Sequence, residues 1–315
     1  MTGAQGQVVV VCGPTASGKT ALGVALARRF GGEVVSADSM QVYRGMDIGT
    51  AKPTWEEMEG VPHHMLDVAD PREDYSVARY VEDATRAVED ILGRGRLPIV
   101  VGGTGLYIDH LLAGREFAPL SGRLRAELLR EVEERGLASL YDELGRVDPQ
   151  RQRELHPNDE KRILRALEIY RETGETMTEW NRRSRERPPR YRAVWLGLDF
   201  ARREALWERI DRRVDEMMAR GLPEEVRGLL KSGVSPQATA MQAIGYKELA
   251  QAALEGGGLD RAAEEVKLRS RQYAKRQRTW FRREPGVNWL LWEQTADFFP
   301  LRQKATDILE ELGYD

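Results

Sequence analysis

The sequence at residues 13–20 reads Gly13-Pro14-Thr15-Ala16-Ser17-Gly18-Lys19-Thr20, which matches the phosphate-binding pattern G-x-x-x-x-G-K-[ST]. The glycines let backbone N–H groups converge on an anion, and the helix that follows adds its positive N-terminal end. Lys19 adds a full charge, and the Thr20 hydroxyl is a candidate Mg²⁺ ligand. We therefore predict that this whole segment binds a diphosphate. A glycine turn that merely precedes a lysine is the structural alternative.

The segments on either side of this loop indicate a parallel sheet. Residues 8–12 are mostly β-branched, which is typical of a buried parallel strand, and residues 20–30 carry apolar side chains at helical spacing. The predicted fold class is α/β, a P-loop NTPase-like parallel sheet with helices on both faces. Further strands are predicted at residues 33–36, 97–101, 193–198 and 288–292, and helices at 75–93, 106–112, 204–220 and 259–283.

The pattern changes between residues 115 and 192, where no strand is predicted. Apolar side chains recur there at helical spacing within a strongly charged stretch. We therefore expect an all-helical insertion domain at residues 115–192. The catalytic core is then formed by residues 1–114 and 193–315.

The composition is that of a folded protein with an ordinary core. Of the 315 residues, 41% are hydrophobic and 31% are charged, and the net charge of −3 favours no class of partner. A single cysteine, Cys12, excludes a disulfide within the chain and a cysteine-rich zinc site. The polar start at residues 1–7 does not resemble a signal peptide, and no apolar run approaches the ~20 residues that span a bilayer. We expect a cytoplasmic protein that acts as a monomer.

Two polar residues follow predicted strands at the edge where such sheets form their ligand crevice. Asp38 follows the strand at 33–36, and Thr104 follows the strand at 97–101. Asp38 is a candidate general base or hydrogen-bond acceptor, with a helix cap or turn residue as the alternative. Thr104 is a candidate donor to a phosphate or leaving-group oxygen, and a cap is again the alternative.

A kinase that uses ATP on this loop would need an acidic residue at a strand end to hold Mg²⁺. The strand at 97–101 lacks one. Asp199 follows the strand at 193–198, but we interpret it as a helix cap. His63 and His64 are adjacent on an extended segment, where their side chains point to opposite faces, so structural or substrate-lining roles are favoured over a metal pair.

A basic segment at residues 267–283 contains no acidic residue and predicts binding of nucleic acid. Its aromatic residues could stack on bases, while its basic residues could contact phosphates. A solvated helix face is the alternative. The basic residues that follow helical spacing, and so form one positive stripe, are Arg271, Lys275, Arg278 and Arg282.

Several segments, spread over most of the chain, resemble those of tRNA dimethylallyltransferases, also called tRNA isopentenyltransferases. Residues 13–20 are shared with many NTPases, but the whole set in this order is specific to the family. The other segments are SADSMQVY (36–43), DIGTAKP (47–53), HHMLD (63–67), GGTGLY (102–107), HPND (156–159) and MQAIGYK (241–247).

The resemblance implies a reaction and its partners. Dimethylallyl diphosphate would donate its five-carbon group to the exocyclic N6 amine of the adenosine 3′ of the anticodon in tRNA, and diphosphate would leave. By the same resemblance, Asp38 is the general base, Thr104 contacts the diphosphate at the breaking bond, and Arg125 contacts substrate. With a single cysteine the chain has no zinc finger of the kind that some eukaryotic members carry, which implies the bacterial type.

We further expect a set of tRNA contacts, part of them in the helical insertion, with Mg²⁺ as the cofactor. An ATP-dependent small-molecule kinase that uses the same loop is the alternative function, and a non-catalytic RNA-binding module is a third. Besides the positive stripe, the residues expected to contact tRNA are Asp38, Ser39, Met40, Gln41, Lys161, Arg162, Ile163, Leu164, Arg165, Gln242, Gly245, Tyr246 and Lys247.

Overall fold

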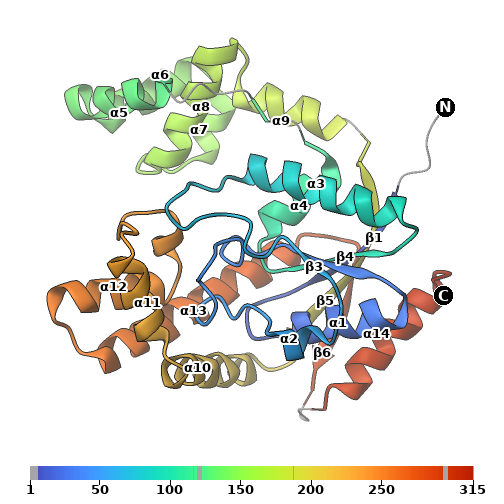
Figure 1. Ribbon diagram of the computed structural model, residues 1–315. Coiled ribbons are helices and arrows are strands. Elements are labelled where there is room, and N and C mark those ends of the chain that lie inside the picture. The colour runs from blue at the N-terminus through green and yellow to red at the C-terminus, as the bar shows by residue number, and fades with distance from the viewer. Residues whose placement is uncertain (1–5, 116, 119–122, 187, 294–296, 315) are drawn as a thin grey trace. The chain divides into compact units, whose positions relative to one another are not determined.

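A computed structural model describes residues 6–115, 117–118, 123–186, 188–293 and 297–314 (Figure 1). Residues 1–5, which belong to the polar start considered above, lie outside this part. The chain divides into two compact units. The first unit consists of Met1–Leu112 and Arg190–Asp315, and the second unit is Ala113–Pro189. The sequence places the corresponding boundaries at residues 115 and 192.

The first unit contains the strands β1 (Gly6–Cys12), β2 (Glu33–Ser36), β3 (His63–His64), β4 (Pro98–Gly102), β5 (Tyr191–Phe200) and β6 (Val287–Trp292). They form one sheet in the order β3-β2-β4-β1-β5-β6, and each pairing of neighbouring strands is parallel, which confirms the predicted α/β class. Cys12 lies beside Gly102 in the register of β1 and β4, so the loops that follow these strands are neighbours.

Helices cover both faces of this sheet. The helices of the first unit are α1 (Lys19–Arg29), α2 (Trp55–Met58), α3 (Val77–Gly93), α4 (Gly105–Ala113), α10 (Arg203–Ala219), α11 (Leu222–Lys231), η1 (Ala240–Gln242), α12 (Tyr246–Glu255), α13 (Leu259–Phe281) and α14 (Phe299–Glu311). Figure 1 shows α3 and α4 on one side of the sheet, and α1 and α14 on the other.

Apolar side chains join one face of the sheet to α1 and α14. Val9 and Val11 of β1 lie in a buried cluster with Leu22 of α1. The same cluster contains Leu301 and Leu309 of α14. These two leucines are about two helical turns apart, so they lie on the same face of their helix. The C-terminal helix is therefore an integral part of the layer that also contains α1.

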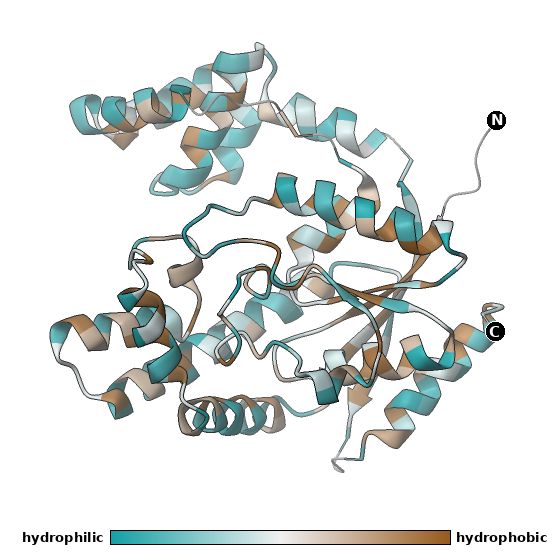
Figure 2. Cartoon of the chain, in the orientation of Figure 1, coloured by the Kyte–Doolittle hydropathy of each residue, from teal (hydrophilic) through white to brown (hydrophobic). Residues whose placement is uncertain are grey.

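The opposite face of the sheet is covered by aromatic packing between two helices. Tyr80 of α3 stacks on Tyr107 of α4, with 4.0 Å between the ring centroids, and both side chains are buried. The central strands are thus buried on both sides, as parallel strands usually are, and they appear as hydrophobic ribbons in Figure 2.

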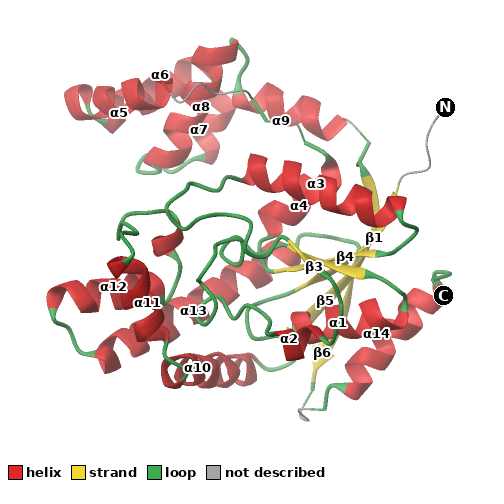
Figure 3. Ribbon diagram, viewed as in Figure 1, coloured by secondary structure: helices red, strands yellow, loops and turns green. Residues whose placement is uncertain are grey.

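The second unit contains the helices α5 (Arg123–Arg135), α6 (Leu137–Val147), α7 (Pro149–Glu154), α8 (Glu160–Thr173) and α9 (Met177–Glu186). In the part of this unit that the structure describes, these helices are joined by loops, without a strand (Figure 3). Leu128 and Ile163 belong to its own apolar core. Arg171 of α8 adds ion pairs to Glu131 of α5 at 2.6 Å and to Glu143 of α6 at 2.7 Å.

The search for membrane spans covers only the described residues. None of the helices there combines the length and the apolar character that crossing a bilayer requires.

Candidate active site

The predicted phosphate loop connects β1 to α1 and lines a cavity of 1440 Å³ in the first unit. Gly13 has a φ of 143°, and a Cβ atom there would lie 2.3 Å from the carbonyl oxygen of Leu198 in β5. Only glycine fits at this position, because the backbone of β5 passes so close to the loop. The loop therefore has the strand–loop–helix geometry that the sequence predicts.

Several cationic side chains line this cavity, and two of them, Lys19 and Arg213, lie near Asp38. Lys19 begins α1, and burial together with the nearby charge of Arg213 lowers its pKa to about 8. Burial also lowers the pKa of Arg213 on α10, while Asp38 opposes that shift. Among the described residues, no carboxylate lies within ion-pair distance of Arg213. Two clustered cations without a bound carboxylate are suited to a polyanionic ligand.

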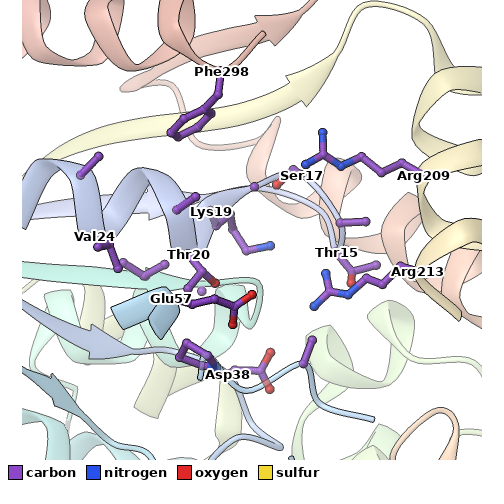
Figure 4. Close-up of a pocket in the computed structure, with 18 of the residues that line it drawn as sticks. Thr15, Ser17, Lys19, Thr20, Val24, Asp38, Glu57, Arg209, Arg213 and Phe298 are labelled. Carbon is purple, nitrogen blue, oxygen red and sulfur yellow. The ribbon is translucent and has the colours of Figure 1, made fainter. Parts of the chain in front are cut away.

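Asp38 lies just beyond β2, and its carboxylate points into the same cavity as Lys19 and Arg213 (Figure 4). Its Oδ1 atom also accepts hydrogen bonds from the backbone N–H of Met40 at 2.8 Å and of Gln41 at 3.3 Å. The turn role and the cavity-facing role, which are alternatives at the level of the sequence, are therefore both present.

Thr104 lies beside this turn, between β4 and α4. Its Oγ1 atom accepts a hydrogen bond from the backbone N–H of Ser39 at 3.2 Å, and its own N–H donates to the carbonyl of Ala37 at 3.2 Å. Its backbone carbonyl accepts the N–H of Tyr107 in the first turn of α4. The structure thus brings Thr104 next to Asp38, and the side chain serves the Asp38 turn instead of its own helix.

Magnesium binding requires oxygen ligands. Among the described residues, no group of three or more His, Cys, Asp or Glu side chains could hold a metal ion. Mg²⁺ usually keeps several waters and takes its other ligands from substrate phosphates and one or two protein oxygens. The Thr20 hydroxyl and the Asp38 carboxylate both line the cavity and fit that mode of binding.

Comparisons with known proteins agree with this geometry. The family model described as IPP transferase matches residues 41–284, and the one described as Isopentenyl transferase matches residues 6–73. A tRNA dimethylallyltransferase from Caldanaerobacter subterraneus is 45% identical over 306 residues, which cover 96% of this chain and 97% of that protein. This chain belongs to the tRNA dimethylallyltransferase family.

Solved structures of the family are similar over nearly the whole chain. A tRNA isopentenylpyrophosphate transferase from Bacillus halodurans is 41% identical, with a TM-score of 0.72 and coverage of 98% of this chain and 96% of that chain. A eukaryotic dimethylallyltransferase acting on tRNA is 31% identical, with a TM-score of 0.84 and coverage of 97% and 80%. The bacterial relatives match the chain over almost their full length, as the predicted bacterial type implies.

The positive stripe of this transferase is largely paired with acidic residues from other elements. Arg271 forms an ion pair with Asp211 of α10 at 2.7 Å, and Arg278 forms one with Asp199 of β5 at 2.9 Å. Arg282 also reaches Asp199, at 3.3 Å. Lys275 is exposed and has no ion-pair partner among the described residues. The lack of acidic residues within the segment therefore does not leave the whole stripe available to RNA.

The predicted role of Asp199 as a helix cap is wrong. Asp199 lies within β5 and is 1% exposed, whereas α10 begins only after Arg202. A buried carboxylate needs a cation, and Arg278 and Arg282 supply that charge. The local sequence resembles a strand end followed by a helix, which is why the two roles cannot be told apart without the tertiary contacts.

The segment at 241–247 contains both buried and exposed residues. Tyr246 is fully buried, and its hydroxyl donates to Glu225 of α11. That carboxylate also accepts backbone N–H groups from the loop at residues 47–49. Gly245 is buried too, at the start of α12. Of the residues expected to contact tRNA here, only Gln242 and Lys247 are exposed.

The two histidines have the structural and lining roles that the sequence favours. The Nε2 atom of His64 lies 2.7 Å from Oε2 of Glu33. His63 lines the cavity, its Nδ1 atom lies 2.9 Å from the carbonyl oxygen of Val61, and burial lowers its pKa.

The remaining candidates lie in the second unit. Arg125 of α5 lies near Arg165 of α8, and its charge adds to the burial that lowers the pKa of Arg165. Lys161 and Arg162 are exposed on α8. Ile163 and Leu164 are also among the residues expected to contact tRNA, but both side chains are fully buried in the core of this unit.

Sequence reasoning missed several residues of the cavity, among them the arginines Arg209 and Arg213. They lie one turn apart on α10, and both line the cavity (Figure 4). Two arginines at i and i+4 on a helix share one face, and this spacing is the signal that could have found them.

Proposed function

We propose that this chain transfers the dimethylallyl group from dimethylallyl diphosphate to the N6 amine of the adenosine 3′ of the anticodon in tRNA, releasing diphosphate. The observation that carries the proposal is the meeting of Asp38, Lys19 and Arg213 in one cavity. Asp38, as the general base, then faces the cations Lys19 and Arg213 that bind the departing diphosphate. Family membership makes the acceptor a tRNA.

The chemistry assigns a task to each of these groups. The N6 amine is a poor nucleophile, because its lone pair is delocalised into the adenine ring. Asp38 accepts the amine proton as the carbon–nitrogen bond forms, while the bond between the allylic carbon and the diphosphate oxygen breaks. Lys19, Arg213 and the loop N–H groups stabilise the negative charge on the departing diphosphate.

The proposal also includes Mg²⁺ and a change in the position of the adenosine. Thr20 would hold Mg²⁺, which supplies additional charge neutralisation on the diphosphate when it is bound. The adenosine must leave its stack to reach the cavity, as the substrates of other base-modifying enzymes do. The monomeric state and the cytoplasmic location stay predictions.

A small-molecule kinase on the same loop is less well supported. In the described part of the chain, β4 ends at Gly102 without an acidic residue for Mg²⁺, and Asp199 is engaged by two arginines. The relatives reported above are named as transferases that act on tRNA. Transfer of labelled phosphate from ATP to any acceptor would favour the kinase.

The proposal is tested by incubating the protein with Mg²⁺, labelled dimethylallyl diphosphate and an anticodon stem-loop that carries the adenosine. We expect label in the RNA. A matched stem-loop with inosine at that position lacks the N6 amine and should remain unlabelled. Absence of label from the adenosine stem-loop, with a folded protein, would reject the proposal.

A further inference from the structure

Gln277 of α13 connects two loops of the active site through its side-chain amide. It is 5% exposed. Its Oε1 atom accepts a hydrogen bond from the backbone N–H of Thr15 at 2.8 Å, and its Nε2 atom donates to the carbonyl oxygen of Gly103 at 2.9 Å. The first loop follows β1 and the second follows β4, so a single side chain bridges the loops beyond these two paired strands.

The two contacts need a side chain that both accepts and donates a hydrogen bond, and a carboxamide meets this need. The Thr15 N–H needs an acceptor, and the Gly103 carbonyl needs a donor. A carboxylate only accepts and an ammonium group only donates, whereas the glutamine amide does both. The approach is also close, because a Cβ atom on Gly103 would lie 2.1 Å from Nε2 of Gln277.

The contacts of α13 extend from Gln277 toward the proposed base. Tyr273 lies one turn earlier on the helix, lines the cavity, and interacts with the side chains of Thr104 and Gln277. Thr104 in turn accepts the N–H of Ser39, next to Asp38. A continuous set of contacts therefore runs from the diphosphate loop to the turn that holds Asp38.

We infer that Gln277 is a positioning residue for prenyl transfer, which sets the diphosphate loop relative to Thr104 and Asp38. The inference rests on the proposed function. Gln277 also lines the cavity, but both polar atoms of its amide are engaged by the two loops, so it acts by holding Thr15 and Gly103 in place. Because bond formation and bond breaking share one carbon, a shift of about 1 Å between these groups can lower the rate by about 10².

The test compares Gln277→Met, which removes both hydrogen bonds at similar volume, with Gln272→Met on the exposed side of the same helix. We expect Gln277→Met to lower kcat by about 10- to 100-fold and to leave the KM for the stem-loop within about twofold. Gln272→Met should retain the wild-type kcat, because in the described part of the chain Gln272 contacts neither loop of the active site. Gln277→Glu retains an acceptor for Thr15, loses the donor to Gly103, and should also raise the KM for dimethylallyl diphosphate through its negative charge.

A purely structural role for Gln277 predicts a different outcome. Activity would then recover at temperatures well below the Tm of the variant, where the protein is fully folded, whereas a misplaced loop lowers kcat at all temperatures. A folded Gln277→Met with wild-type kcat would overturn the inference and leave the proposed function intact. A wild-type protein that transfers no label would overturn both.

Discussion

Asp38 has two roles in this structure, because its carboxylate both holds a turn and faces the cavity. Replacement by alanine would remove both, so Asp38→Asn is the sharper test. An asparagine retains an oxygen for the N–H of Met40 but cannot serve as a base. We expect single-turnover rates to fall by about 10²–10⁴, with stem-loop affinity largely unchanged. An unaltered rate would remove Asp38 from the mechanism.

Lys19 should impose an alkaline limit on the use of the donor. Only the charged ammonium group attracts the diphosphate, and burial with the nearby Arg213 lowers the pKa of Lys19 to about 8. The kcat/KM for dimethylallyl diphosphate should therefore fall as the pH rises through about 8, since this parameter reports the free enzyme. Bound diphosphate favours the charged lysine, so the decline in kcat should occur at higher pH. A kcat/KM that stays constant well above this pH would contradict the prediction.

Helix α13 makes different predictions for its two faces, because Gln277 and Ala274 are buried whereas Lys275 is exposed. Lys275→Ala on the solvent face should weaken stem-loop binding and reduce the slope of log K against log salt by about 0.7–0.9, the share of one phosphate contact. Filter binding over a range of salt concentrations measures this slope. A slope equal to that of the wild type would show that Lys275 does not contact RNA.

Arg278 lies on the inner side of the same helix, and its replacement should lower the free energy of unfolding. Arg278→Ala would leave the buried Asp199 with only the more distant Arg282, which destabilises by on the order of 3 kcal/mol. Urea unfolding measures this loss, with Lys275→Ala as the matched control. Equal stability of the two variants would contradict this assignment.

The stability of the whole molecule should depend on Glu33. Its side chain links the start of β2 to His64 of β3 and to Arg94, the residue that follows α3. The buried carboxylate pairs with Arg94 and His64, and its hydrogen bond to Arg94 is the main reason that its pKa is lowered to about 2. A carboxylate with a lowered pKa in the folded state stabilises the fold above its unfolded pKa of about 4.3, and this contribution is lost as the pH falls toward about 2.

Glu33→Gln should therefore lower the free energy of unfolding at pH 7 by on the order of 3 kcal/mol and flatten its dependence on pH between about 4.5 and 2. Urea unfolding at several pH values measures both effects. Glu82→Gln, on the exposed face of α3, is the control, because that side chain is 71% exposed. An unchanged pH dependence in Glu33→Gln would contradict the prediction.

Elements with a clear local pattern can be predicted from the sequence. The strand at 33–36 coincides with β2, and the helix expected at 259–283 corresponds to α13 at Leu259–Phe281. Strand β3 has only two residues, too few to show an alternating pattern. Helices α11, α12 and α14 are absent from the predicted elements, although their lengths of 10, 10 and 13 residues are ordinary for helices. In α11, Leu222, Val226 and Leu229 recur at helical spacing, so a local signal was present there.

Local sequence is sufficient to place the diphosphate loop, the strand before it, the helix after it and Asp38 at a strand end. These features depend on neighbouring residues, so their spacing along the chain reveals them. The folded structure is needed to show that Arg213 faces Asp38, that Asp199 pairs with Arg278, and that Gln277 holds a loop 262 residues away. Such contacts join distant parts of the chain, and no local pattern reports which side chains the fold brings together.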